Sequence, residues 1–275
     1  MTLETLSALS LFEPRVTLSH FEGEPLELEL GTKLRAAAQV IEWCHLNGAQ
    51  ILYPGHPDYP PSFRYLEKPP LYLSCLGSAP WLQSSCLSIV GSREPTRRSL
   101  EWMETHLPEL LRGSDIAVVS GGARGIDQKA HVLSIRSKRP TVVFLPSGFE
   151  RVYPPEARDW LKEAIAGGGA VLSLLSPWEE VRRHYFEARN HLIASMGNAV
   201  FVVEARRRSG SMMTARLARD LGRPLAALPS APGEPKTAGT LDLVVDGDCA
   251  ILRDATDLKA FFSLAAVTPR YKCVL

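Results

Sequence analysis

The chain has 275 residues, enough to bury a sizeable core in one large domain or in one medium domain with a smaller companion. Its 31 Lys and Arg residues nearly balance its 30 Asp and Glu residues, which leaves a formal net charge of +1. This balance excludes a uniformly basic nucleic-acid-binding protein, so any basic site must be local.

The five cysteines are widely spaced and form no C-x-x-C motif, which fits neither a disulfide framework nor a zinc site. We therefore expect no bound metal and a reducing compartment. The chain has neither a charged-then-apolar N-terminal segment nor a long uncharged apolar run. These features predict a cytoplasmic protein that does not enter a membrane.

The part of the chain before residue 86 is weakly patterned. Residues 1–52 predict a small helical region, in which the only clear amphipathic helix runs from Lys33 to Asn47. Residues 53–85 are rich in proline and predict a linker that leads into a sheet. The residue pattern changes at residue 86, where we expect the main domain to begin.

In residues 86–265, short runs rich in Val, Ile and Leu alternate with helical patterns, and residues 266–275 are expected to form a tail. This alternation predicts an α/β fold with a doubly wound, mostly parallel sheet that helices cover on both faces. The expected strands are Leu87–Val90, Ile116–Val119, Thr141–Leu145, Ala170–Leu174, Ala199–Val203 and Leu225–Leu228.

Apolar side chains at steps of three and four predict a helix after each of the first five strands. We expect the first of these helices to begin at Pro95, to be kinked by Pro108 and to end at Gly113. The other four helices are marked by Ile126, Ala130 and Leu133; by Trp160, Leu161, Ala164 and Ile165; by Leu192, Ile193 and Met196; and by Met213, Leu217 and Leu221.

Small residues follow three of the expected strands, in the turns Gly91–Arg93, Ser120–Gly125 and Ser209–Ser211. Because the carboxyl ends of parallel strands share one edge of a sheet, we expect these turns to be neighbours near a switch in strand order. Glycine lets a ligand approach the backbone, and the first amides of the helix that follows carry partial positive charge. Although such residues are common in turns for structural reasons alone, three turns with arginines nearby predict several phosphate-binding sites.

A dinucleotide site would require G-x-G-x-x-G after a strand, with an acid at the end of the next one, but the sequence reads G-G-x-x-G with no such acid. The string of a P-loop is absent as well. We therefore expect no cofactor, and several phosphate sites in a row favour a polymer over one small ligand.

These residues resemble the DNA-processing protein A (DprA/Smf) family over roughly residues 53–247. The family's Ile-Val-Gly-Ser-Arg block is matched by Ile89–Arg93, and its Ser-Gly-Gly-Ala-x-Gly-Ile-Asp-x-x-Ala-His block by Ser120–His131 without a gap. Later matches in family order are Tyr153-Pro154, Phe186 with Arg189-Asn190, and Ser209-Gly210-Ser211. Departures such as Arg97-Arg98 and His191 mark a divergent member, which we expect to lack the family's C-terminal winged-helix module.

The resemblance implies an extended Rossmann-like fold, a homodimer, and sequence-tolerant binding of single-stranded DNA. It also implies delivery of that DNA to the RecA recombinase in natural transformation, without covalent catalysis. The expected DNA-binding residues are Gly91, Ser92, Arg93, Arg97, Ser120, Gly121, Gly122, Phe186, Arg189, Asn190, Ser209, Gly210 and Ser211.

Several of these residues have a competing structural interpretation. Arg93 and Arg189 are expected at the surface, where their loss would hardly affect folding, although a salt bridge at the edge of the core is an alternative for Arg189. Phe186 either stacks on a base or packs in the core. The pair Asp127 and His131 fits capping or packing better than acid-base catalysis, and Glu204 is expected to order the loop that follows it.

Two other functions are open to such a sequence. A phosphoribohydrolase-like enzyme would need a helix glutamate, and the matching turn Arg206–Thr214 lacks it. A nucleotide-sensing module would bind a small ligand and signal to a partner, and only the number of expected phosphate sites argues against it. Saturation by a mononucleotide, as opposed to a requirement for an oligonucleotide, distinguishes these functions.

Overall fold

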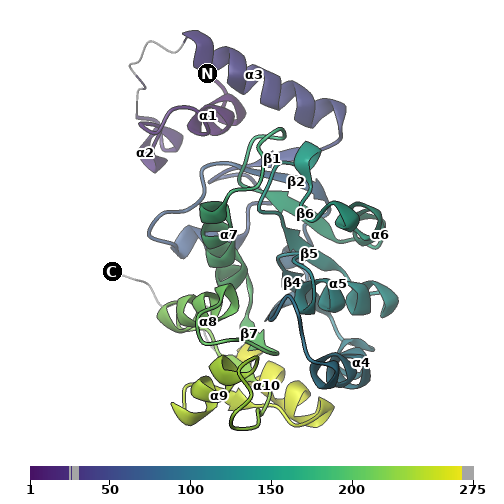
Figure 1. Cartoon of the computed structure of the whole chain (residues 1–275). Helices are drawn as coiled ribbons and strands as arrows, with labels where there is room; N and C mark the ends of the chain where they lie inside the picture. The colour runs from purple at the N-terminus through teal and green to yellow at the C-terminus, as the bar shows by residue number, and fades with distance from the viewer. Residues whose placement is uncertain (25, 27–30, 268–275) are drawn as a thin grey trace.

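The computed structural model describes residues 1–24, 26 and 31–267, and its centre is a sheet with the strand order β1-β2-β6-β5-β4-β3-β7-β8-β9 (Figure 1). The strands from β6 to β9 in this spatial order all pair in parallel, while β1 and β2 pair antiparallel with their neighbours. The strands are β1 (Gln50–Leu52), β2 (Leu73–Gly77), β3 (Ser85–Val90), β4 (Ile116–Ser120), β5 (Thr141–Phe144), β6 (Ala170–Ser173), β7 (Ala199–Val202), β8 (Leu225–Ala227) and β9 (Ala250–Ile251).

All six strands expected from the sequence are present, with ends that differ from the expected ones by at most two residues. Each of these runs is buried along nearly its whole length, as a strand covered on both faces requires. The mostly parallel α/β architecture is therefore confirmed.

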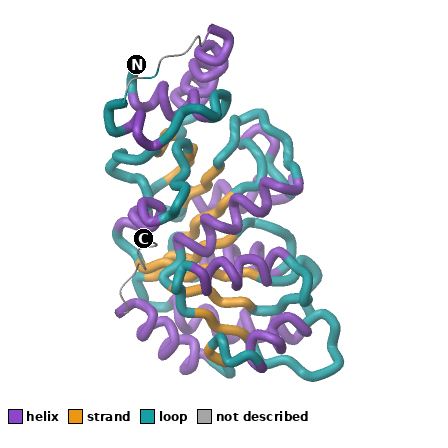
Figure 2. Tube along the Cα trace, turned by 90° about the vertical axis from the view of Figure 1, so that its left-hand side faces the viewer, coloured by secondary structure: helices purple, strands orange, loops and turns teal. Residues whose placement is uncertain are grey.

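Helices pack on both faces of the sheet, in front of and behind the orange strands in Figure 2. Helices α4, α5, α6 and α10 bury apolar side chains on one face, and α7, α8 and α9 on the other. The helices are α1 (Leu3–Ser10), α2 (Leu18–Phe21), α3 (Gly31–Leu46), α4 (Arg97–Leu111), α5 (Ile126–Arg136), α6 (Arg158–Ala166), α7 (Arg183–Met196), α8 (Gly210–Asp220), α9 (Ala238–Val245) and α10 (Ala255–Val267). Short 3-10 helices occur at η1 (Pro61–Tyr65), η2 (Pro80–Leu82), η3 (Phe149–Arg151) and η4 (Pro155–Ala157). Within the described part of the chain, no helix is both long and apolar enough to cross a membrane.

Helix α4 begins later than the sequence predicts. Pro95 lies before the helix, and the hydroxyl of Thr96 caps it by accepting from the Ser99 amide. A serine or threonine at this position satisfies one of the amides left unpaired by the first turn, so the capping side chain sets the start. Pro108 lies inside α4, which continues to Leu111.

The sequence predicts that the proline-rich segment 53–85 is a linker leading into the sheet, but the segment is itself part of the sheet and of its core. Strand β2 lies within it and pairs antiparallel with β6. Tyr59 and Phe63 are fully buried against Phe144 of β5 and other core residues. Sequence reasoning missed this because β2 is short and prolines interrupt the pattern before it.

The N-terminal helices form a small subdomain at one end of the sheet (Figure 1). Helices α1 and α3 pack on each other and on β1 through their own apolar cluster, which includes Leu9 and Val40. The Ser7 hydroxyl also donates to the carbonyl oxygen of Leu71, which ties α1 to the segment before β2. The helix expected over Lys33–Asn47 corresponds to α3.

The strand order reverses between β3 and β7, because β4, β5 and β6 extend the sheet on one side of β3 while β7 and β8 extend it on the other. The turns after β4, β3 and β7 are therefore adjacent at one edge, as the sequence predicts. Two hydrogen bonds join them directly. The Ile126 amide donates to the Ser92 carbonyl at 3.1 Å, and the Ser211 hydroxyl donates to the Gly91 carbonyl at 2.9 Å.

Gly125 is the point of closest contact between the first two turns. Its φ is +82°, and a Cβ on it would overlap the Ser92 carbonyl oxygen and lie 2.8 Å from that of Arg93. Gly125→Ala should therefore lower the free energy of unfolding by about 3 kcal/mol or more in urea denaturation, since it adds a backbone clash to the strain of a positive φ.

Gly113→Ala is the matched control, because Gly113 has φ +73° and nothing lies within 4 Å of its Cβ position. Backbone strain alone predicts a loss of about 1 kcal/mol for this variant. Equal losses for the two variants would contradict the close packing of the turns.

Candidate nucleic-acid interface

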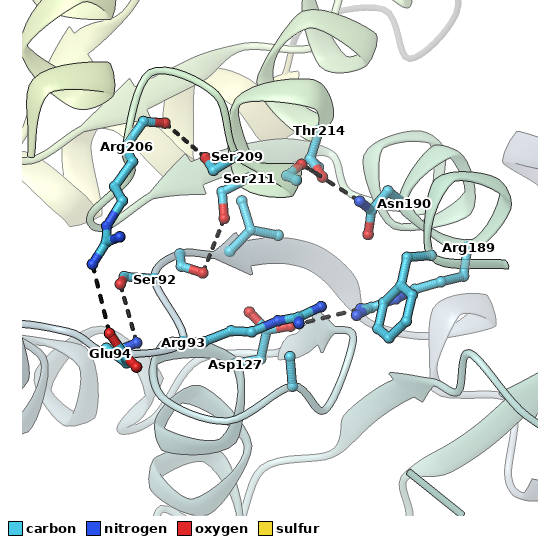
Figure 3. A pocket seen from close by; sticks show the side chains of 15 residues that line it. Ser92, Arg93, Glu94, Asp127, Arg189, Asn190, Arg206, Ser209, Ser211 and Thr214 are labelled. Atoms are coloured by element: carbon cyan, nitrogen blue, oxygen red, sulfur yellow. Dashed lines mark hydrogen bonds and ion pairs between the residues drawn. The ribbon is translucent and has the colours of Figure 1, made fainter. Parts of the chain in front are cut away.

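A cavity of about 380 Å³ lies where the strand order reverses, and we call it the switch-point cavity (Figure 3). The three turns and helix α7 supply its walls. It is lined by Val90, Gly91, Ser92, Arg93, Glu94, Ala123, Asp127, Phe186, Arg189, Asn190, Arg206, Ser209, Gly210, Ser211 and Thr214.

A second depression of about 660 Å³ adjoins this cavity, and we call it the basic groove. The two share the residues Arg93, Phe186, Asn190, Ser209 and Gly210, so they form one continuous surface. The basic groove is lined by Arg93, Tyr153, Val181, Arg182, Arg183, Phe186, Glu187, Asn190, Arg208, Ser209, Gly210, Met213 and Arg216.

Helix α8 points its N-terminus toward the switch-point cavity. The Ser209 hydroxyl accepts from the Met212 amide at 3.3 Å and caps the helix. The amides of Gly210 and Ser211 belong to the first turn, where backbone N–H groups have no partner within the helix and carry the positive end of the helix dipole. This turn can therefore receive a phosphate oxygen.

At the floor of the cavity, a buried ion pair joins helices α5 and α7. The Arg189 and Asp127 side chains are 5% and 7% exposed, and Nη1 lies 3.6 Å from Oδ2. A Cβ on Gly121 would overlap the Arg189 guanidinium, so this turn needs glycine to make room for the arginine. Burial raises the pKa of the Asp127 carboxyl, an effect that the Arg189 charge and the Ala123 amide oppose.

The surface position expected for Arg189 is therefore wrong, and its alternative role in a salt bridge is confirmed. The sequence could not show this, because the partner Asp127 is 62 positions away and meets Arg189 only through the fold. Arg189 nevertheless remains a lining residue of the cavity.

The half-buried ring of Phe186 contacts two cations. The guanidinium carbon of Arg93 lies 4.9 Å from the ring centroid, and that of Arg189 lies 5.5 Å from it. Such cation–π contacts hold a guanidinium in place while leaving its N–H donors available to a ligand. Phe186 lies at the wall shared by the cavity and the groove, outside the apolar clusters of the core.

Four of the expected DNA-binding residues are absent from the linings of both depressions. Ser120 is buried, and its hydroxyl donates to the Ile89 carbonyl. Gly121 and Gly122 are buried in the turn that follows Ser120. Arg97 is exposed and pairs with Glu101 one turn further along α4, at 2.6 Å. Ser120, Gly121 and Gly122 shape the turns, while Arg97 lies outside both depressions.

Glu204 orders a different segment from the one that the sequence predicts. Its buried carboxylate accepts hydrogen bonds from the Thr96 amide and hydroxyl and from the Ser99 hydroxyl, at 2.7–2.9 Å. It therefore fixes the start of α4 instead of the loop after β7.

Sequence reasoning missed most of the basic groove. Arg182, Arg183 and Arg216 line it, and only Glu187 among its lining residues carries negative charge. Arg182 lies 3.2 Å from Glu179, but no described carboxylate lies within 4 Å of Arg93, Arg183, Arg208 or Arg216. A net charge of +1 thus conceals a concentrated positive site.

His131 is a packing residue, as the sequence suggests. Its Nδ1 lies 2.7 Å from the Thr141 hydroxyl, and its ring stacks on Trp160 at a centroid distance of 5.1 Å. Burial, aided by the Arg189 charge, lowers the pKa of His131 from 6.5 to about 3. Among the described residues, no group of three or more His, Cys, Asp and Glu side chains is placed to hold a metal ion.

The buried ion pair predicts a stability difference between two arginines of the site. Arg189→Met should lower the free energy of unfolding by about 3–5 kcal/mol in urea denaturation, because it leaves the Asp127 carboxylate buried without its partner. Arg93→Ala is the matched control and should cost no more than about 1 kcal/mol, since Arg93 is exposed. Losses of similar size for both would contradict the buried pair.

His131 predicts a pH dependence of stability. Its pKa is lower in the folded protein, so the unfolded chain binds more protons below pH 6.5, and stability is lost as the pH falls toward about 3. Between about pH 7 and about pH 5 this loss amounts to about 2 kcal/mol, which His131→Gln should abolish. Urea denaturation of both proteins at the two pH values measures the difference, and an unchanged pH dependence in the variant would contradict the neutral buried imidazole.

Sequence comparison with known proteins identifies one family. The family model for DNA recombination-mediator protein A matches residues 50–263. Protein Smf of Synechocystis is 34% identical over 220 residues, which cover 78% of this chain and 55% of that protein. The DNA processing protein DprA of Bacillus subtilis is 31% identical over 89% of this chain and 83% of its own length. The chain thus spans little more than half of some curated relatives, such as the Smf proteins of Synechocystis and Borreliella burgdorferi.

Two solved structures are similar over most of their length. The DprA structure from Streptococcus pneumoniae aligns with a TM-score of 0.77 at 24% identity, over 94% of this chain and 98% of that one. The DprA structure from Helicobacter pylori, described for its single-stranded DNA binding mode, aligns with a TM-score of 0.69 at 28% identity, over 82% and 97%. The first likeness confirms the Rossmann-like fold.

Proposed function

The chain belongs to the DNA recombination-mediator protein A family, and on this premise we propose that it binds single-stranded DNA with little sequence preference. The strand lies along the basic groove and reaches the switch-point cavity. The observation that carries this proposal is a set of arginines on one continuous surface that have no described carboxylate within 4 Å, namely Arg93, Arg183, Arg208 and Arg216.

Arginine guanidinium groups and helix N-termini both recognise phosphate oxygens and carry no base sequence information. In this site, Arg93 lies at the wall between cavity and groove, and the first turn of α8 lies opposite. A strand that contacts both, with Arg183, Arg208 and Arg216 further along, can place successive phosphates on successive cations. The relative from Helicobacter pylori, described as binding single-stranded DNA, supports this assignment.

We further propose that the protein acts as a homodimer and passes its DNA to the RecA recombinase in natural transformation. Both expectations come from family membership. Because RecA and the bound DNA strand would be met in the cytoplasm, we expect the protein to act there.

We propose no covalent chemistry for the site. Thr214 stands where the phosphoribohydrolases carry their helix glutamate, and its hydroxyl donates to the Gly210 carbonyl at 3.2 Å. The two carboxylates that line the cavity, Glu94 and Asp127, pair with Arg206 and Arg189. Both carboxylates are thus engaged in ion pairs within the protein and neither is free to activate a water molecule, so the site suits binding better than hydrolysis.

Salt dependence tests the DNA site directly. Affinity for an oligo-dT strand should fall linearly on a log–log plot against salt, and Arg93→Ala should weaken binding while making the slope shallower by about 0.7, one phosphate's share for a single strand. Binding to strands of graded length, measured by fluorescence anisotropy at several salt concentrations, gives both the affinity and its salt slope.

Arg136→Ala is the matched control. Arg136 is an exposed arginine in the last turn of α5, and it lies at the amino ends of the parallel strands, away from the cavity. It should leave affinity and slope unchanged. Equal effects of the two substitutions, or saturation of the site by a mononucleotide, would overturn the proposal.

A further inference from the structure

An aromatic side chain outside the expected site residues lies on the wall of the basic groove. Tyr153 is 37% exposed and lines the groove together with Phe186. It belongs to the segment between η3 and η4, which follows strand β5. Because β5 lies beside β4, this segment emerges at the same edge of the sheet as the three turns.

The two aromatic rings of the groove are in different environments. Phe186 contacts the guanidinium groups of Arg93 and Arg189, both within 5.5 Å of its centroid. Tyr153 meets Phe186 edge-on, at a centroid distance of 6.1 Å and an interplanar angle of 87°. Phe186 therefore positions cations, while Tyr153 is held by its contact with Phe186 and keeps part of its ring exposed to the groove.

A single exposed aromatic residue requires no functional explanation by itself. Tyr153 differs because its groove is lined by the exposed arginines Arg182, Arg183, Arg208 and Arg216. A planar ring beside a row of cations is the combination that binds a nucleic-acid strand, since the cations take phosphates and the ring takes the face of a base.

We propose that Tyr153 is a platform on which one unpaired base of the bound strand stacks, and that this contact contributes to a preference for single strands over duplex. The inference rests on the proposed DNA-binding function and adds a residue and a ligand chemistry to it. In a duplex each base face is covered by its neighbours, so stacking on Tyr153 would require a base to leave the helix. The phosphate contacts, in contrast, are available to both forms.

The test uses the whole chain with Tyr153→Ala and Tyr153→Phe, and three DNA probes of equal length: oligo-dT, an abasic strand with the same phosphates, and a duplex. Tyr153→Ala should weaken binding of oligo-dT by about 5- to 150-fold, which corresponds to ~1–3 kcal/mol for one stacked base. Tyr153→Phe should bind within about twofold of the original protein, because the ring face is kept.

The abasic strand separates stacking from charge. The original protein and Tyr153→Ala should bind it equally and with equal salt slopes, because no phosphate contact has changed. The ratio of oligo-dT to duplex affinity should fall in the alanine variant by the same factor as its oligo-dT affinity. Thermal unfolding of each variant, with Tyr153→Leu as an apolar replacement, controls for loss of fold.

Three results would overturn the inference. They are unchanged oligo-dT binding by a folded Tyr153→Ala or Tyr153→Leu variant, an equal loss on the abasic strand, and failure of Tyr153→Phe to retain affinity. If the original protein binds oligo-dT but Tyr153 has no effect, only the stacking role fails. If it binds none of the three probes, the proposed function itself fails.

Discussion

The buried ion pair between Asp127 and Arg189 is the constraint on which the site depends. Two charges removed from water must be paired, since a lone buried charge is strongly destabilising. Meeting this requirement brings the start of α5 and the middle of α7 together at the switch in strand order. It also demands glycine at position 121 and places Phe186, one turn before Arg189 on α7, beside the guanidinium groups of Arg93 and Arg189.

Electrostatic function in this chain comes from how charges are distributed among partners. Several arginines are paired with carboxylates, as in Arg97 with Glu101 and Arg207 with Asp242, and such exposed pairs add little to stability or binding. The arginines of the basic groove differ because most have no described carboxylate within reach. A polyanion can therefore bind there without first displacing acidic side chains, while the chain as a whole stays close to neutral.

Short sequence patterns were enough to predict the features that depend only on neighbouring residues, namely the strands and the turns after them. Buried runs such as Ile116–Val119, and the small-residue turns that follow the strands, were sufficient to predict the sheet, its edge and the turns at Gly91–Arg93 and Ser209–Ser211. Features that depend on distant partners could not be found in this way. The burial of Arg189 depends on Asp127, and the place of segment 53–85 in the sheet depends on β6.

We propose above all that a single DNA strand lies at the carboxyl ends of β3 and β7, where the strand order reverses. A crystal structure of the protein with a bound oligo-dT strand tests this placement most directly. We predict phosphate oxygens within about 3 Å of the Arg93 guanidinium and of the first amides of α8, with the strand continuing along the basic groove. A strand bound at the amino ends of the parallel strands, near Arg112 and Arg136, would contradict this placement.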